Sequence, residues 1–455
     1  MSTQVSVQVT LEVADFTSGL RFADVPAEVR SSTRRHLLDS AGVMLSGRRE
    51  HAAEIALQHA REVSGSEQLS PPLVAFLLGL RGHVDDYDDT QLSTRPEGVY
   101  GLLTHPSVPV LAAVLATGAA VAARGAEAWA AFVAGTEAEC RISDAIDPRH
   151  YQEGFHSSGT VGTLGAALGA ARVLGLDLEQ TRVALGIAAS SAAGLRENFG
   201  TMTKSLHVGR AAEHGVEAAF LARAGWTATS EVLEARRGFF RAFGGGFDEG
   251  LLHGRLGGEW YYLSPGVSIK PHPSGSLTHP AMWEMLQLVR AHDLTPEQVE
   301  SVSVGTNWNM LNALIHHRPQ DELAAKFSME YAIATILLRR KGGLAEYTPA
   351  AVRDPAVQEL IPRIELVTDP VAEAAGFHRM LSRITVRLRD GRELFAEGDA
   401  GRGHPANPMT DEEVAEKFAD CAGWAGLPDG GARVRELIET LAELKDVGEL
   451  TRALL

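Results

Sequence analysis

Alanine-rich runs with helical spacing dominate residues 1–266 and narrow the folds open to this chain. Val29, Leu37 and Ala41 fall close to the 3.6-residue helical period. Alanine and leucine are strong helix formers, and the alternation typical of strands is absent here. Further runs of this kind cover 108–123, 126–146, 159–174, 179–193 and 211–224. The sequence therefore predicts a large all-α domain.

Small residues within one of these runs indicate how its helix packs. Gly162, Gly165 and Gly169 lie three and four residues apart, so they share one helix face and allow a second helix to approach closely. A membrane dimer motif is excluded because Arg172 and polar flanking residues interrupt the run. We predict that this face packs in the core.

The pattern changes after Pro265 to a mixture of strands and helices. The predicted strands are 300–305, 364–367, 383–388 and 392–396, the last two joined by an Asp-Gly turn at 390–391, and the predicted helices are 280–290 and 329–340. The predicted fold is mostly α. It divides into an all-α helical domain over 1–266, a smaller α+β domain over 267–400, and C-terminal helices over 401–455 that return to the helical domain.

Charge and composition exclude several classes of protein. The net charge of −16 argues against nucleic acid or an anionic membrane as the main partner. No run approaches the ~20 apolar residues that span a bilayer, and Met1 is not followed by a signal-peptide pattern, so a cytoplasmic location is expected. Cys140 and Cys421 are expected to be thiols, too few to hold an iron–sulfur cluster.

The densest acidic cluster is Asp85-Asp86-Tyr87-Asp88-Asp89. Carboxylates this close repel one another and need a metal, neighbouring cations or solvent. The spacing does not match an EF-hand loop, and we predict no metal site. A helix terminus or a solvated loop is an alternative interpretation.

Four segments ahead of predicted helices carry histidine or lysine in a chain with few lysines. Six of its 42 basic residues are lysine. The segments contain His105, then His150 and His156, then Lys204 and His207, and finally Lys270 and His279. Helix amino termini favour anions, so together these segments predict a cationic pocket for carboxylates. Taken singly, each histidine is as well explained as a helix cap. Metalloprotease, serine hydrolase and dinucleotide-binding motifs are absent from the sequence.

These segments resemble the MmgE/PrpD family. The matching residues are His83-Val-Asp-Asp86-Tyr-Asp-Asp-Thr90, His105-Pro-Ser, His150-Tyr with Gly154-Phe-His156, Gly200-Thr-Met-Thr-Lys204 with His207, Lys270-Pro with His279, and Ala325-Lys-Phe-Ser328 with Tyr331. The resemblance implies a helical domain built from both ends of the chain, with an α+β lid between them. It also implies a homodimer without metal or organic cofactor.

The resemblance further implies which residues form the site. The positions carried over are Asp86, Thr90, His105, His156, Lys204, Lys270 and Tyr331. The residues expected to bind substrate are Thr90, Lys270 and Tyr331 from this set, together with His207 and His279. Two features depart from the family pattern. Gly275 stands where cysteine or histidine is frequent, and the segment 95–101 is longer than usual.

The family reactions share a carbanion that develops beside a carboxylate of a small polycarboxylate. Cations on that carboxylate and a general acid or base are therefore required. We expect Lys204 and Lys270 to be the cations and His105 to be the acid or base, with His156 as a second acid, base or clamp. Thr90 is expected to hydrogen-bond a substrate carboxylate. Asp86 is expected to fix a histidine tautomer or to keep a lysine protonated. We expect a hydro-lyase that dehydrates a 2-methylcitrate-like acid. The alternatives are a cis-aconitate-type decarboxylase, an iminodisuccinate-type epimerase, and a binding protein without catalytic activity.

Overall fold

The computed structural model describes residues 8–93 and 104–455, which form two compact units. The helical unit comprises 1–84, 103–267 and 413–455, and the mixed unit comprises 85–102 and 268–412. The sequence predicted divisions after 266 and 400. The structure divides the chain after 267 and 412, and it assigns 85–102 to the mixed unit.

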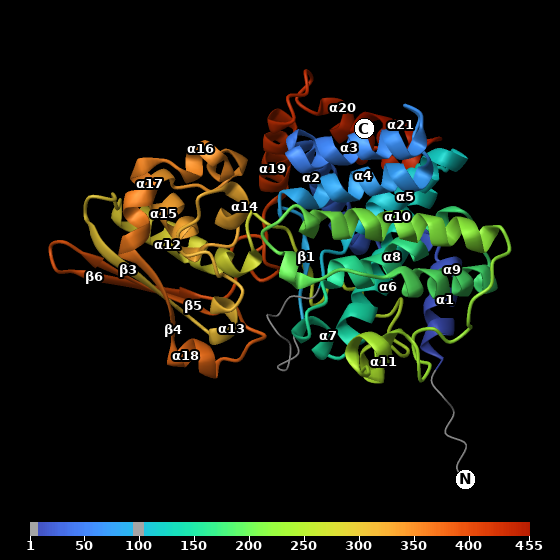
Figure 1. Cartoon of the computed structure of the whole chain (residues 1–455), viewed down its shortest axis with the longest axis horizontal. Helices are drawn as coiled ribbons and strands as arrows, with labels where there is room; N and C mark the ends of the chain where they lie inside the picture. The colour runs from blue at the N-terminus through green and yellow to red at the C-terminus, as the bar shows by residue number, and fades with distance from the viewer. Residues whose placement is uncertain (1–7, 94–103) are drawn as a thin grey trace, which may run out of the picture. The chain divides into compact units, whose positions relative to one another are not determined.

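Helices make up the helical unit, which Figure 1 shows together with the element labels. They are α1 (Val9–Gly19), α2 (Ala27–Ser46), α3 (His51–Ser64), α4 (Pro71–Val84), α5 (Ser107–Val121), α6 (Gly125–Ala145), α7 (Arg149–Gln152), α8 (Ser157–Val173), α9 (Leu178–Ser191), α10 (Thr203–Arg223), α11 (Phe239–Gly244), α19 (Asp411–Trp424), α20 (Ala432–Glu439) and α21 (Gly448–Leu454). The sequence Asp177-x-x-Gln180 predicts a capping box, and this is confirmed, because the Asp177 side chain accepts a hydrogen bond from the Gln180 N–H at the start of α9.

One predicted helix begins eight residues earlier than expected. The run from 211 to 224 predicted α10, but the helix already begins at Thr203, so Lys204 and His207 lie on it rather than in a loop before it. Gly209, inside this earlier part of the helix, lies against α4, where an added Cβ would be 2.9 Å from the Phe76 carbonyl oxygen. Close packing thus offsets the ~1 kcal/mol by which glycine disfavours a helix.

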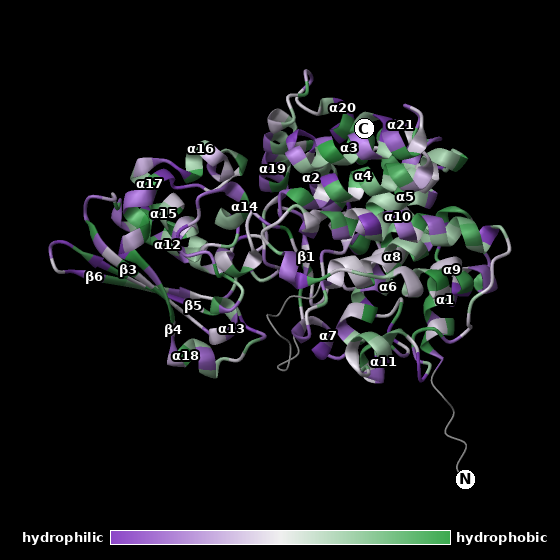
Figure 2. Cartoon of the chain, viewed as in Figure 1, coloured by the Kyte–Doolittle hydropathy of each residue, from purple (hydrophilic) through white to green (hydrophobic). Residues whose placement is uncertain are grey.

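Glycines also let α6 and α8 approach each other, as the sequence predicted. An added Cβ on Gly135 of α6 would lie 2.8 Å from the carbonyl oxygen of Gly165 on α8. Neighbouring α5 is apolar over most of its length and is coloured green in Figure 2. The centre of the helical unit is therefore built from α5, α6 and α8, which are buried along nearly all of their length.

The C-terminal helices are joined to the rest of the helical unit by polar contacts. Lys417 on α19 forms an ion pair with Asp39 on α2 at 2.5 Å, and their side chains are 3% and 0% exposed. On α21, the hydroxyl of Thr451 donates to the carbonyl oxygen of Leu115 at 3.0 Å. The last helices thus complete the same unit that the first helices begin.

The mixed unit contains a four-stranded sheet with helices on it. Its elements are β1 (Thr90–Gln91), β2 (Val267–Ser268, at the unit boundary), α12 (His279–His292), β3 (Val299–Thr306), α13 (Trp308–Leu311), α14 (Glu322–Ala325), α15 (Met329–Arg339), α16 (Pro349–Val352), α17 (Pro355–Leu360), β4 (Ile364–Thr368), α18 (Pro370–Ala374), β5 (Ser382–Leu388) and β6 (Glu393–Gly398). The strand order is β4-β3-β5-β6, with β3 and β4 parallel and the other pairs antiparallel.

The register of the sheet explains its apolar face. Val304 pairs with Ile384 and Val302 with Val386, and all four side chains are fully buried. Helices α12 and α15 cover one face of this sheet (Figure 1). The predicted strands and the hairpin turn at Gly391, whose φ is 87°, are confirmed.

Two further observations bear on the predicted class of protein. Each helix within residues 8–93 and 104–455 is too short or too polar to cross a bilayer. Cys140 and Cys421 are both buried thiols without a disulfide.

We predict that the buried ion pair between α2 and α19 is required for stability. Replacing Lys417 by alanine leaves the Asp39 carboxylate buried without this cation, which costs about 3–5 kcal/mol of unfolding free energy. The control is Arg435→Ala, because the Arg435–Glu439 pair is about half exposed and such pairs contribute ~0–1 kcal/mol. Urea unfolding followed by circular dichroism measures both. Equal midpoints for the two variants would contradict the prediction.

Candidate functional site

The helical unit gathers four histidines and a lysine, which we call the imidazole cluster. Its members are His83 at the end of α4, His105 just before α5, His156 at the N-cap of α8, and Lys204 and His207 on α10. Sequence motifs separated by more than a hundred residues thus meet within one unit. All the predicted site residues of the helical unit belong to this cluster.

Close packing of α4 on α10 brings the first pair of the cluster together. An added Cβ on Gly79 of α4 would lie 2.9 Å from the Val208 carbonyl oxygen and 3.2 Å from the Gly209 Cα on α10. His83 follows Gly79 by one helical turn, and Lys204 lies in the first turn of α10. The Lys204 Nζ therefore reaches the His83 Nε2 at 2.9 Å.

This contact determines the tautomer of His83 when Lys204 is protonated. A protonated lysine amine has only donors, so the His83 Nε2 must accept the hydrogen bond. The ring is then neutral, with its hydrogen on Nδ1. His83 is 1% exposed and Lys204 7%, so the pair is shielded from solvent.

A second contact joins His156 and His207, whose Nδ1 atoms lie 3.0 Å apart. Burial, followed by the nearby His83 and Lys204, lowers the pKa of His156 well below its usual value. Burial, followed by Lys204, lowers the pKa of His207 to about 4. Both rings are therefore neutral near pH 7, and one Nδ1–H donates to the other Nδ1.

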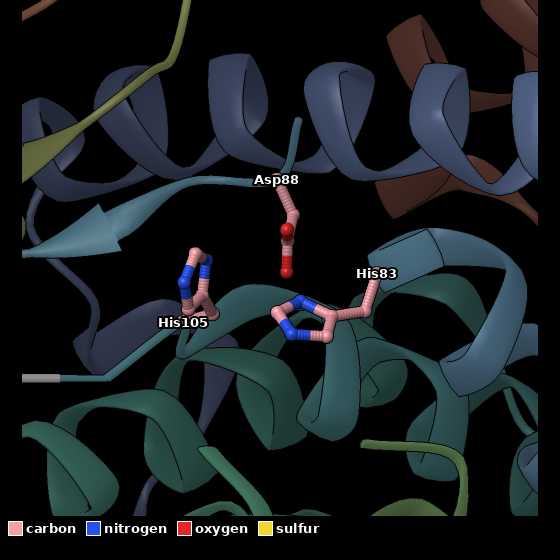
Figure 3. A group of neighbouring side chains, drawn as sticks. All are labelled: His83, Asp88 and His105. Carbon is pink, nitrogen blue, oxygen red and sulfur yellow. The ribbon is translucent and has the colours of Figure 1, made fainter. Parts of the chain in front are cut away.

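His105 is the half-buried ring beside this buried group. Its centroid lies 4.7 Å from that of His83, in an edge-on arrangement. Figure 3 shows the two rings. His83 and His156 are 1% and 3% exposed, so His105 is the member of these three best placed to exchange protons with solvent.

The mixed unit holds a second group around the acidic cluster predicted from the sequence. Lys270 Nζ lies 3.1 Å from Asp86 Oδ1 and donates to the Asp86 carbonyl oxygen at 2.8 Å. Asp86 has a φ of 52°, an uncommon left-handed conformation. Lys270 contacts both the carboxylate and the carbonyl oxygen of this residue. Of the two roles predicted for Asp86, the structure shows pairing with a lysine.

The rest of the acidic cluster is also buried, so the interpretation as a solvated loop is wrong. Asp85 is 2% exposed, and its Oδ1 lies 3.6 Å from the Nζ of Lys326. Thr90 Oγ1 lies 3.2 Å from Ser276 Oγ. Two lysines thus supply the neighbouring cations that the carboxylates were predicted to need.

Two predicted substrate-binding residues of the mixed unit are enclosed by protein. The pKa of His279 is well below its usual value because of burial and then His272, and its Nε2 lies 3.3 Å from Ser274 Oγ. Tyr331 is 0% exposed and its hydroxyl donates to the Glu346 carbonyl oxygen. Burial raises the pKa of Tyr331 to about 12. Substrate contacts by these two residues remain a prediction.

Sequence reasoning missed His83 and Lys326 as site residues. Both stand in segments that matched the family pattern, at the start of the His83–Thr90 run and in Ala325-Lys326-Phe327-Ser328. Lys326 was also one of the rare lysines. The signal was present, but position in a motif alone did not tell which histidine would face Lys204.

The two departures from the family pattern have different outcomes. An added Cβ on Gly275 would lie 3.4 Å from the Phe327 ring, an ordinary contact, so the structure has room for a Cβ there. The segment 95–101 lies outside the described residues.

His150, which was grouped with His156 in the sequence, has a structural role instead. It is 2% exposed, and its Nδ1 lies 3.2 Å from the Phe243 carbonyl oxygen. Its Nε2 lies 2.8 Å from Thr160 Oγ1, and its ring stacks on Phe155. Burial lowers the pKa of His150 to about 4.

Comparison with known proteins matches nearly the whole chain. The model of the MmgE/PrpD N-terminal domain matches residues 11–251, and that of the MmgE/PrpD C-terminal domain matches 272–443. The human protein named cis-aconitate decarboxylase is 28% identical over 98% of this chain and 94% of its own length. The protein of that name from Aspergillus terreus (strain NIH 2624 / FGSC A1156) is 24% identical over 98% of this chain and 96% of its own length.

We predict that acid destabilises the fold through His150. Its pKa is lower in the folded than in the unfolded state, so unfolding binds a proton between the two values. Stability is therefore full above pH 6.5 and falls as the pH drops towards about 4, by about 3 kcal/mol in all. Urea unfolding at several pH values gives the unfolding free energy at each pH. The slope of this free energy against pH should be shallower for His150→Gln, which cannot titrate. An unchanged slope would contradict this assignment.

Proposed function

Because the chain belongs to the MmgE/PrpD family, we propose that it is a lyase that removes carbon dioxide from a cis-aconitate-like tricarboxylate. The observation that carries this proposal is the imidazole cluster, in which an ammonium lies among neutral rings. The names of the relatives favour decarboxylation over the dehydration that we expected first. Dehydration of a 2-methylcitrate-like acid is therefore the second candidate.

Decarboxylation of such an acid needs an atom that accepts an electron pair and a group that supplies a proton. The carbon–carbon bond to the departing carboxylate breaks, and its electrons move through the neighbouring double bond to the carbon beside another carboxylate. That carbon takes up one proton, which gives an unsaturated dicarboxylate and carbon dioxide. Negative charge develops next to the retained carboxylate, so a nearby cation stabilises the transition state.

In this proposal Lys204 is the cation, and His83 holds it in place. The 2.9 Å contact to a neutral ring positions the ammonium and leaves its charge uncompensated. A carboxylate partner would instead neutralise that charge. A preorganised charge of this kind costs no reorganisation during the reaction.

His105 is the proposed proton donor to carbon. His156 and His207 have lowered pKa values, so they are poor sources of an imidazolium proton at neutral pH. His105 is half-buried and borders His83, which lets it take a proton from water between turnovers. His156 and His207 then serve as neutral hydrogen-bonding partners.

The residues of the mixed unit are proposed to bind substrate carboxylates. Lys270 and Thr90 were expected to do so, and the Asp86 contact keeps Lys270 in its charged form. Since Lys270 is 1% exposed, its fixed position suits recognition of one carboxylate group rather than a range of ligands.

We predict that the protein converts cis-aconitate with uptake of solvent hydrogen at a single carbon. In D₂O, proton NMR should show the alkene hydrogens of the unsaturated dicarboxylate that remains after loss of carbon dioxide. It should also show one deuterium on the carbon beside a retained carboxylate. Parallel samples with 2-methylcitrate and iminodisuccinate test the dehydratase and epimerase alternatives. No reaction with any of the three would support a binding protein without catalytic activity.

We predict that Lys204→Ala and His105→Ala each lower kcat/KM by about 10²–10⁴-fold, because each removes a group that acts on developing charge or on the transferred proton. Lys445→Ala is the control, since Lys445 is an exposed lysine on the C-terminal part of the same unit. Thermal unfolding checks that all three variants fold. Near wild-type turnover in both site variants would refute the assigned roles.

Lys270→Ala should raise KM by about tenfold or more while lowering kcat less, because it removes a charged hydrogen bond to a bound carboxylate. Asp86→Asn should have a smaller effect in the same direction. Lys341→Gln is the matched control, as this exposed lysine lies in the same unit. Steady-state kinetics, with the same substrate for every variant, measures kcat and KM. An unchanged KM in Lys270→Ala would contradict the binding role.

A further inference from the structure

Glu139 is a carboxylate buried in the middle of the helical unit, outside the imidazole cluster. It lies on α6 and is 0% exposed. Glycines on α8 leave space for the Glu139 side chain. An added Cβ on Gly165 would lie only 2.4 Å from the Glu139 Oε2. An added Cβ on Gly162 would lie 3.7 Å from its Oε1. The glycine face that the sequence assigned to packing therefore also accommodates a charged group.

Polar contacts connect this carboxylate to the backbone of His105. The hydroxyl of Thr104 donates to Glu139 Oε1 at 2.9 Å and lies 3.4 Å from Ser158 Oγ. Ser158 Oγ in turn accepts the backbone N–H of His105 at 3.0 Å. Thr104 and Ser158 are each 1% exposed, so these bonds form away from water.

The same contacts connect two members of the imidazole cluster. Ser158 lies in the first turn of α8, two residues after His156 at the N-cap of that helix. The network therefore links the peptide of His105 to the helix end that carries His156.

We infer that Glu139, through Thr104 and Ser158, is a positioning residue that holds His105 in the orientation needed for proton transfer. This inference rests on the proposed function. Burying a carboxylate is costly, and an apolar residue at 139 would fill the space between α6 and α8 without that cost. Proton transfer in turn requires heavy atoms within about 2.6–3.2 Å, so a displaced ring loses rate even when the fold persists.

The decisive variant is Thr104→Val, which removes the hydroxyl and keeps the shape of the side chain. We expect kcat to fall by about 10–100-fold with KM changed by less than about threefold, because ground-state binding of the acid is retained. Thr104→Ser restores the hydroxyl and should recover most of the rate. Glu139→Gln, which keeps an oxygen acceptor for Thr104, should lie between these two variants.

The matched control is Thr163→Val on α8. Its hydroxyl is equally buried and donates to the Gly159 carbonyl oxygen at 2.8 Å, apart from the network. Both valine variants should lower the unfolding temperature by similar amounts, but Thr163→Val should keep kcat within about twofold of wild type. Equal kcat values for the two valine variants, or failure of Thr104→Ser to recover the rate, would overturn the inference.

A measurement without substrate separates this inference from the proposed function. In protein labelled with nitrogen-15 in histidine, the imidazole signals of His105 should shift in Thr104→Val and stay at wild-type positions in Thr163→Val. If wild-type protein converted none of the three acids, the proposed function would fail, and these signals would still report on the positioning. Unshifted His105 signals in Thr104→Val would overturn the positioning itself.

Discussion

The close approach of α4 and α10 determines where the reactive groups of the helical unit can lie. At Gly79 and Gly209 the two helices approach closely, because an added Cβ on either glycine would lie 2.9 Å from a carbonyl oxygen of the other helix. One turn further along, His83 and Lys204 are near enough for a hydrogen bond of 2.9 Å. A methyl group at either glycine would separate the helices by a few tenths of an ångström or more, because interiors are already close-packed. The chemistry of the cluster thus depends on residues that have no functional group.

Burial of charge is handled differently in the imidazole cluster and in the acidic cluster at 85–89. In the helical unit, burial lowers the pKa values of His156 and His207, so these rings are neutral beside an ammonium. In the mixed unit, Lys270 and Lys326 instead form ion pairs with Asp86 and Asp85. Neutral rings can exchange protons with little electrostatic cost, whereas fixed ion pairs provide rigid recognition of an anion. This difference matches the separate roles proposed for the two groups.

The fold was predictable from local patterns, but the contacts within the site were predictable only in part. The capping box at Asp177 and the hairpin turn at Gly391 depend on neighbouring residues, and both were found as expected. The start of α10 was missed because the alanine-rich run that predicted it begins only at 211, after the first eight residues of the helix. Motifs identified Lys204 and His105, yet not the neighbour of Lys204. Pairing between distant helices depends on crossing geometry, which a single sequence does not reveal.

The division of the chain has a consequence for its synthesis. The helical unit begins before residue 84 and is completed only by 413–455, after all of the mixed unit has been made. Because domains tend to fold from the amino terminus during translation, the partners of Lys417 and Thr451 must wait for the end of the chain. A ribosome that stops early would release a chain in which α2 and α5 lack the C-terminal helices that pack against them. Premature termination near the C-terminus should therefore produce aggregates rather than a shortened active protein.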